Sequence, residues 1–70
     1  MSDDDFNMSM RKFLKQVGVT SQQEIEKAVR EARAAGRLPD DSVTARMVLI
    51  IDEIGMEHVV EGVIKTGNGA

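Results

Sequence analysis

KQVGVTSQQEIEKAV, Lys15 to Val29, is the stretch on which the fold depends, because it is either the turn and reading helix of a DNA-binding module or a hinge between two packed helices. Glycine, here Gly18, commonly follows the end of a helix, because it adopts the left-handed backbone conformation at little cost in free energy. The tetrapeptide Ser21-Gln22-Gln23-Glu24 has the capping-box form that begins a helix. These signals predict that one helix ends at Gly18 and that another begins at Thr20 or Ser21.

Amphipathic patterns lie on both sides of this hinge. Apolar residues spaced three or four apart share one face of a helix. The first set predicts a helix from about Asp4 to Val17, with its acidic start at the positive end of the helix dipole. The second set predicts a helix that stops at Gly36. The first set comprises Phe6, Met10, Phe13, Leu14 and Val17, and the second comprises Ile25, Ala28, Val29 and Ala32.

After the turn cluster Leu38-Pro39-Asp40-Asp41, apolar residues recur at every second position instead of every third or fourth. Alternating β-branched residues predict strands over residues 43–51 and 56–65. With a four-residue loop, Asp52 to Gly55, the corresponding faces of the two strands lie on the same side of the sheet. A three-residue loop with a bulge at Gly55 would reverse the faces of one strand. The four-residue loop predicts these cross-strand pairs: Ile51 with Met56, Leu49 with His58, Met47 with Val60, Arg46 with Glu61, and Val43 with Ile64.

These elements together define the expected architecture. A lone two-stranded hairpin is marginal in water, so the helices are expected to cover one of its faces. The sequence predicts an α+β fold in which two N-terminal helices, a helical hairpin, pack on a C-terminal two-stranded antiparallel β-hairpin. Residues 1–66 are expected to form this single small domain, and residues 67–70 a flexible tail.

Length and composition exclude several classes of protein. A chain of 70 residues makes one domain at most. The absence of cysteine excludes disulfides, thiol catalysis and cysteine-ligated metal centres. The start MSDDDFN is acidic where a signal peptide is basic, and no apolar run reaches the roughly 18 residues of a membrane helix. We therefore expect a cytoplasmic protein that binds no membrane, metal or cofactor.

The net charge of -3 is unevenly distributed, which raises the possibility of nucleic-acid binding. Seven bases outnumber three acids from Phe6 to Leu38, and GVTSQQ is similar to the turn of a helix-turn-helix. Against this hypothesis, Glu24 stands where the common turn has an apolar residue, and Glu24 and Glu26 would face phosphates. Nucleic-acid binding is therefore the alternative function, with candidate residues Arg11, Lys12, Lys15, Gln22, Gln23, Arg30, Arg33 and Arg37.

Residues for metal binding or catalysis are sparse. His58 is the single histidine, which is too few for a usual zinc site in a chain without cysteine. Asp52, Glu53, Glu57 and Glu61 cluster near the hairpin turn, but they lack the ligand spacing and glycine of a calcium loop. No Ser-His-Asp set or glycine-rich phosphate loop is visible, so we expect no enzyme activity.

An exposed face of the hairpin is the strongest functional feature of the sequence. If one face packs on the helices, the other still presents apolar side chains beside two unpaired strand edges. A second copy or another protein would cover both. The sequence therefore predicts a non-enzymatic protein-interaction module with an unidentified partner protein or a homodimer, and the candidate binding residues are Val48, Ile50, Val59 and Val63.

The stretch FNMSMRKFLKQVGVTSQQEIEKAVREA, followed by a spacer and a hairpin ending HVVEG, resembles a family of short bacterial proteins classed as a domain of unknown function. The resemblance extends from about Phe6 to Gly62, and its most specific part is the block RKFLKQVGVTSQQEIEKAVRE. It implies relatives of similar size with no assigned activity. It therefore supplies no catalytic or binding residues for this chain.

Overall fold

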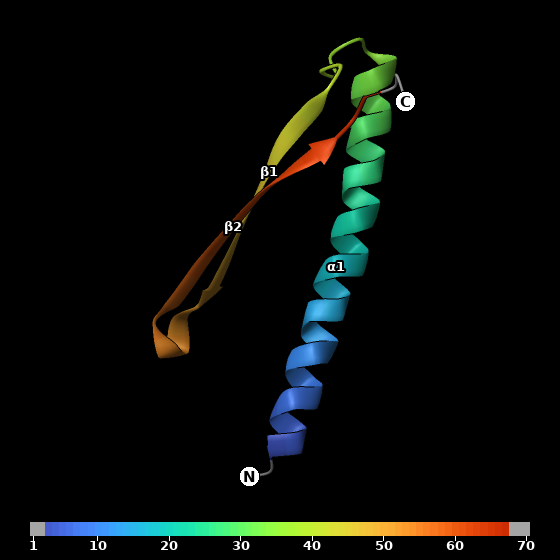
Figure 1. Cartoon of the computed structure of the whole chain (residues 1–70). Helices are drawn as coiled ribbons and strands as arrows, with labels where there is room; N and C mark the ends of the chain where they lie inside the picture. The colour runs from blue at the N-terminus through green and yellow to red at the C-terminus, as the bar shows by residue number, and fades with distance from the viewer. Residues whose placement is uncertain (1–2, 68–70) are drawn as a thin grey trace. The chain divides into compact units, whose positions relative to one another are not determined.

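The structure is a computed structural model that describes residues 3–67 of the 70-residue chain. The order of elements is helix α1 (Asp3–Ala34), strand β1 (Ser42–Ile51), the short 3-10 helix η1 (Asp52–Ile54) and strand β2 (Met56–Lys65) (Figure 1). Two compact units divide the chain, residues 1–37 with the helix and residues 38–70 with the hairpin. The fold is α+β, as expected, but it has one long helix where two were predicted.

The predicted hinge is wrong, because α1 is a single helix of 32 residues. Gly18 lies inside α1, and among the described residues only Gly36 and Gly55 have a positive φ. Ser21 is likewise a helix-interior residue and not an N-cap. The helical hairpin of the predicted fold is therefore replaced by one continuous helix.

Helix propensity opposes the continuation of α1 through residues 17–21, whereas backbone hydrogen bonding and the apolar stripe favour it. Val, Gly, Val, Thr and Ser in this order cost about 3 kcal/mol of helix propensity relative to alanine. A break would leave backbone N–H and C=O groups without intrahelical partners and would divide an apolar stripe that stays in phase across it. The Thr20 hydroxyl donates to the Gln16 carbonyl at 2.8 Å, a bond typical of threonine inside a helix. The backbone hydrogen bonds and the apolar stripe of a continuous helix therefore outweigh the capping signals at Gly18 and Ser21.

The C-terminus of α1 lies where the sequence predicted it. Gly36 has a φ of 73°, in the left-handed region that glycine tolerates. Its N–H donates to the Arg33 carbonyl at 3.1 Å, and the Arg37 N–H donates to the Ala32 carbonyl at 2.8 Å. These two bonds form a Schellman motif. The predicted stop at Gly36 is confirmed.

The hairpin has the register predicted from the four-residue loop, including every pair named above. Ile51 pairs with Met56, and η1 with Gly55 forms the loop between them. Gly55 has a φ of 64°, and its N–H donates to the Asp52 carbonyl at 3.1 Å. The faces of the two strands therefore match as expected, and the bulged alternative is excluded.

Hydrogen bonds close the base of the hairpin. Thr66, 6% exposed, is the one buried residue in the described part of the chain. Its Oγ1 donates to the Pro39 carbonyl at 2.8 Å, and its N–H donates to the Asp41 carbonyl at 2.9 Å. The Gly67 N–H also donates to the Asp41 carbonyl, at 3.1 Å. Gly67 is thus held at the hairpin base, while residues 68–70 of the expected tail lie outside the described residues.

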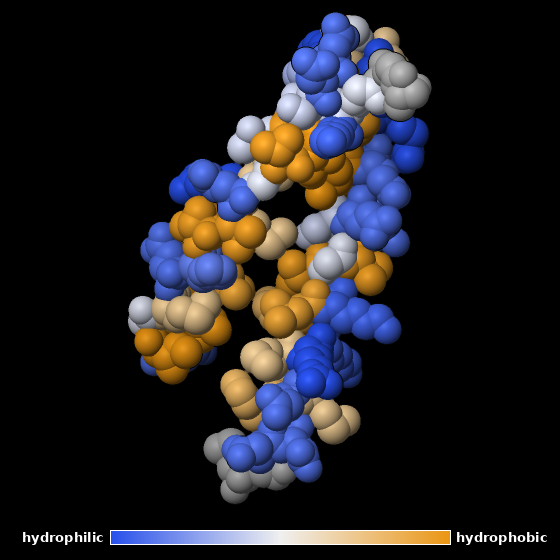
Figure 2. Space-filling view, viewed as in Figure 1, coloured by the Kyte–Doolittle hydropathy of each residue, from blue (hydrophilic) through white to orange (hydrophobic). Residues whose placement is uncertain are grey.

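Neither unit encloses an apolar core. Across residues 3–67, no hydrophobic side chain is buried. Figure 2 shows apolar side chains gathered along α1 and on the hairpin. A single helix and a two-stranded sheet each present apolar surface that they cannot cover by themselves. Both units therefore leave apolar side chains exposed across residues 3–67.

Candidate functional site

One face of the hairpin carries all four residues predicted to bind a protein. Successive side chains of a strand point to opposite faces, so Val48 shares a face with Ile50, and Val59 with Val63. The pairing of Val48 with Val59 joins these two sets into one surface, the valine face. The exposed fractions of Val48, Ile50, Val59 and Val63 are 40%, 56%, 42% and 67%.

The opposite face of the hairpin carries both half-buried and exposed residues. Five of its residues are half-buried, namely Val43, Ala45, Leu49, Met56 and Ile64. On the valine face, the four apolar residues are all exposed. Three further apolar residues of the opposite face are exposed, namely Met47 (43%), Ile51 (37%) and Val60 (51%). The valine face is thus the face on which every apolar side chain is exposed.

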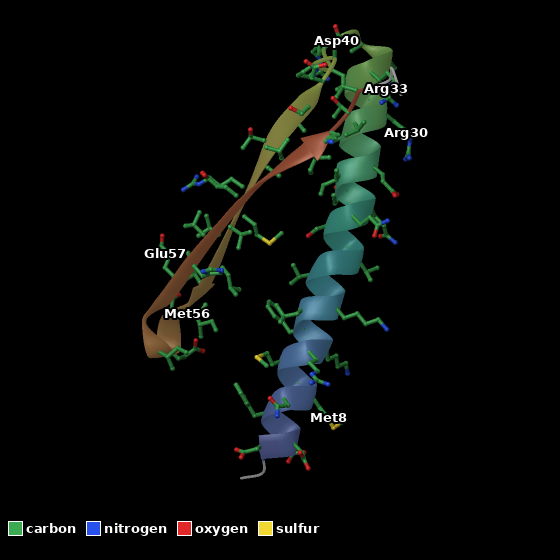
Figure 3. All side chains as sticks on the ribbon, viewed as in Figure 1. Met8, Arg30, Arg33, Asp40, Met56 and Glu57 are labelled. Atoms are coloured by element: carbon green, nitrogen blue, oxygen red, sulfur yellow. The ribbon has the colours of Figure 1, made fainter. Side chains whose placement is uncertain are left out.

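Charged side chains surround the apolar centre of the valine face. Arg46 Nε lies 3.8 Å from Glu61 Oε2, which confirms the predicted cross-strand pair. Both side chains are exposed, so this ion pair contributes little to stability. Glu57 lies toward the turn end of the same face, opposite Ile50 (Figure 3). An apolar centre with a charged rim is the usual composition of a protein interface.

The hairpin also offers backbone groups. Its sheet has two strands of ten residues each, so in the described part of the chain each strand has one unpaired edge. Alternate N–H and C=O groups point outward at such an edge and can pair with an added strand. The valine face and the edges adjoin, so one partner can use both.

The two units have different charge. Residues 38–67 contain six acids and two bases, which gives -4, whereas residues 3–37 contain seven bases and six acids, which gives +1. A negative surface attracts basic partners and repels polyanions. The hairpin is therefore acidic, whereas the helix unit is close to neutral.

The candidate nucleic-acid residues have no helix-turn-helix to position them. Gln22 and Gln23 lie inside α1, not at the start of a reading helix. The Gln22 amide donates to Glu26 Oε2 at 3.2 Å. The helix-turn-helix part of the alternative hypothesis is wrong, while nucleic-acid binding itself stays a prediction. The basic candidates are all exposed, namely Arg11, Lys12, Lys15, Arg30, Arg33 and Arg37.

Among residues 3–67, no group of three or more His, Asp or Glu side chains is placed to hold a metal ion. His58 is exposed and pairs across the sheet with Leu49. The described part of the chain also contains no helix with an apolar run long enough to cross a membrane.

The family model for a family of unknown function, DUF6494, matches residues 1–67. The chain belongs to this family. The resemblance expected for residues 6–62 is thereby confirmed, and the DUF6494 match includes both α1 and the hairpin. Searches of curated proteins and of solved structures gave no significant match. The DUF6494 description assigns no activity, so the candidate site rests on its geometry.

Sequence reasoning missed one surface, because it placed the apolar residues of the helix in a core. Phe6, Phe13 and Leu14 are 58%, 49% and 49% exposed. The signal for this surface is the apolar period on either side of Gly18, which marks a helix face but does not distinguish one helix from two.

Proposed function

We propose that this chain is a small non-enzymatic interaction module that binds another protein through the valine face of its hairpin. The observation that carries the proposal is the set of four exposed apolar side chains on one face of a sheet with two unpaired edges. Exposed apolar patches with a polar rim are typical of interaction sites.

The chemistry of the hairpin defines the partner. Strand addition at β1 or β2 supplies backbone hydrogen bonds, and the apolar side chains beside that edge supply contact area. Glu57 and Glu61 lie on the valine face, and the unit has a net charge of -4 over residues 38–67. The partner segment is therefore extended, with apolar side chains on one side and basic residues flanking them.

A photo-crosslinking experiment in the protein's own cells tests this proposal. p-Benzoylphenylalanine placed at Val48 or Val59 of the full chain is expected to give one discrete adduct with another protein. The same probe at Val19 is a matched control, because Val19 is an exposed valine of α1 (47%) and lies off the hairpin. Equal adduct yield at Val19, or no adduct from the hairpin, contradicts the proposal, and an adduct containing two copies of this chain replaces the foreign partner with a homodimer.

A double substitution separates binding from folding. Val48→Thr with Val59→Thr keeps size and strand propensity but removes apolar surface, so the circular dichroism spectrum is expected to persist. The adduct formed by a probe at Val63 is expected to fall several-fold, whereas Val19→Thr leaves it unchanged. Severe unfolding of the double variant at every protein concentration contradicts the assignment of the exposed face, and makes the face with Met47, Leu49 and Val60 the binding surface to test.

A further inference from the structure

The basic residues of α1 gather on one side of the helix. At about 100° per residue, all of them fall within an arc of about 160°. Between residues 11 and 33 this arc contains a single acid, Glu26. Glu24 and Glu31 lie outside the arc, on the side of the helix that carries the two phenylalanines. We call this surface the basic face, and its bases, all exposed, are Arg11, Lys12, Lys15, Lys27, Arg30 and Arg33.

Acids of the chain do not neutralise the basic face. Within residues 3–67, the ion pair of Arg46 with Glu61, at 3.8 Å, lies on the hairpin, and none involves a base of α1. Glu26 precedes Arg30 by four residues, a spacing at which opposite charges can pair. Its Oε2 instead accepts the Gln22 amide at 3.2 Å. The charges of the basic face are therefore available to a partner.

The basic face contains one arrangement of bases twice. Lys12 and Lys15 are three residues apart, and so are Arg30 and Arg33. Like charges at this spacing destabilise a helix, which indicates a role other than folding. The second pair follows the first after 18 residues, which is five complete turns and about 27 Å along the axis. Both pairs therefore point in the same direction, and Figure 3 shows Arg30 and Arg33 extending from the same side of α1.

The distance between the two pairs selects a long polyanion. A ligand that contacts both must carry negative charge over about 27 Å, which no small anion does. A nucleic-acid duplex has one phosphate charge per 1.7 Å of axis, hence about 16 over this length. Lysine, arginine and glutamine side chains are usual donors to phosphate oxygens. Gln16 and Gln23 are exposed on the basic face between the two pairs.

The other side of α1 distinguishes a nucleic acid from a membrane surface. A helix that binds a membrane places its apolar side in the interface. In α1 that side carries Glu24 and Glu31, which anionic headgroups would repel. A nucleic acid needs to contact only the basic face, so the charges of α1 favour it.

We propose that the basic face of α1 binds the phosphate backbone of a nucleic acid without reading its sequence. This binding needs no helix-turn-helix and does not depend on the valine face. The hairpin unit has a net charge of -4 over residues 38–67, which repels a polyanion and confines the contact to α1. Because the contact is made by charge, its affinity falls steeply as salt is raised.

Fluorescence anisotropy of the full chain tests the proposal with two labelled probes, a duplex of about 20 base pairs and a single strand of the same length. Binding is expected at about 50 mM salt, and the affinity is expected to fall about a hundredfold between about 50 and 200 mM. Binding of either probe supports the proposal, and the tighter one identifies the form of nucleic acid. No binding of either probe at about 50 mM salt overturns it.

Removal of single charges tests the face. Lys12→Gln and Arg30→Gln are each expected to weaken binding about tenfold at about 50 mM salt, and to lower the slope of log K against log salt concentration by about one. Lys12→Arg keeps the charge and is expected to bind like wild type. Lys65→Gln makes the same change in net charge at an exposed lysine of the hairpin and is expected to leave binding unchanged.

Circular dichroism checks that α1 stays folded in each variant. Equal weakening by Lys65→Gln would show that only net charge matters and would overturn the assignment to the basic face.

Two other polyanions test the class of partner. Polyglutamate is expected to displace the labelled duplex far less well than unlabelled duplex does, and equal displacement assigns the basic face to acidic proteins. Vesicles of phosphatidylcholine and phosphatidylserine are expected to bind no chain. Binding to these vesicles without binding to nucleic acid assigns the face to a membrane surface. Both of these contrary results overturn nucleic-acid binding and leave the crosslinking test at Val48 and Val59 unaffected.

Discussion

Gly18 and Gly36 each follow an amphipathic stretch, yet α1 continues through the first and ends at the second. At Gly36 the backbone turns left-handed, and the N–H groups of Gly36 and Arg37 bind carbonyls of the last turn. Pro39 follows, cannot continue a helix, and has its carbonyl bound by Thr66. After Gly18 no comparable capping bonds or proline replace the helical hydrogen bonds. A glycine thus ends a helix when the residues beyond it are stabilised elsewhere.

The largest effect is expected for Gly36→Val. A side chain at a φ of 73° is strained even though an added Cβ would meet nothing within 4 Å. A β-branched residue in this conformation is expected to lower the free energy of unfolding by about 2 kcal/mol. Urea unfolding followed by circular dichroism measures the loss, with Ala35→Val as the neighbouring control. A loss below about 0.5 kcal/mol contradicts the special role of Gly36.

Thr66→Val tests whether the hairpin base stabilises the region after Gly36. The substitution keeps the shape of a buried side chain and removes the hydrogen bond to the Pro39 carbonyl. The expected loss is about 1 kcal/mol. Thr44→Val, an exposed strand position, is the matched control and is expected to change stability by less than about 0.5 kcal/mol. Equal effects at the two positions would show that the bond at the base is unimportant.

Gly18→Ala is expected to act in the opposite direction. Gly18 is inside α1 without a positive φ, and an added Cβ meets nothing within 4 Å. Alanine is therefore expected to raise the free energy of unfolding by about 0.5–1 kcal/mol. The same urea experiment measures it. A loss comparable to that of Gly36→Val would mean that the helix ends at Gly18 after all.

The smallest effect is expected for Ser21→Ala. An N-cap serine contributes about 0.5–2 kcal/mol, but Ser21 is a helix-interior residue. Replacement by the best helix former is therefore expected to leave stability unchanged or to raise it by about 0.5 kcal/mol. Thermal unfolding of the variant beside wild type measures the difference. A clear loss would restore the capping box as a true helix start.

The hairpin was predictable in detail, whereas the continuity of α1 was not. Loop length and alternation together set the strand register, because a slip of one residue moves Val48 and every other side chain to the opposite face. The capping box at Ser21 contributes about 1 kcal/mol to helix stability. The uninterrupted backbone hydrogen bonds across Gly18 contribute more, but no residue type marks them in the sequence. The exposure of Phe6 and Phe13 depends on what packs against α1, which the sequence pattern of one chain does not specify.

The unpaired edges of the hairpin determine how its amide protons exchange with solvent. In an antiparallel pair, successive N–H groups point alternately toward the neighbouring strand and away from it. Every second amide of β1 and of β2 is therefore protected, and those between them exchange freely. A partner that adds a strand beside β1 slows the exchange of the unprotected amides of β1 and leaves the alternating exchange pattern of β2 unchanged. A partner that binds only side chains leaves both strands alternating, so the exchange pattern identifies the occupied edge.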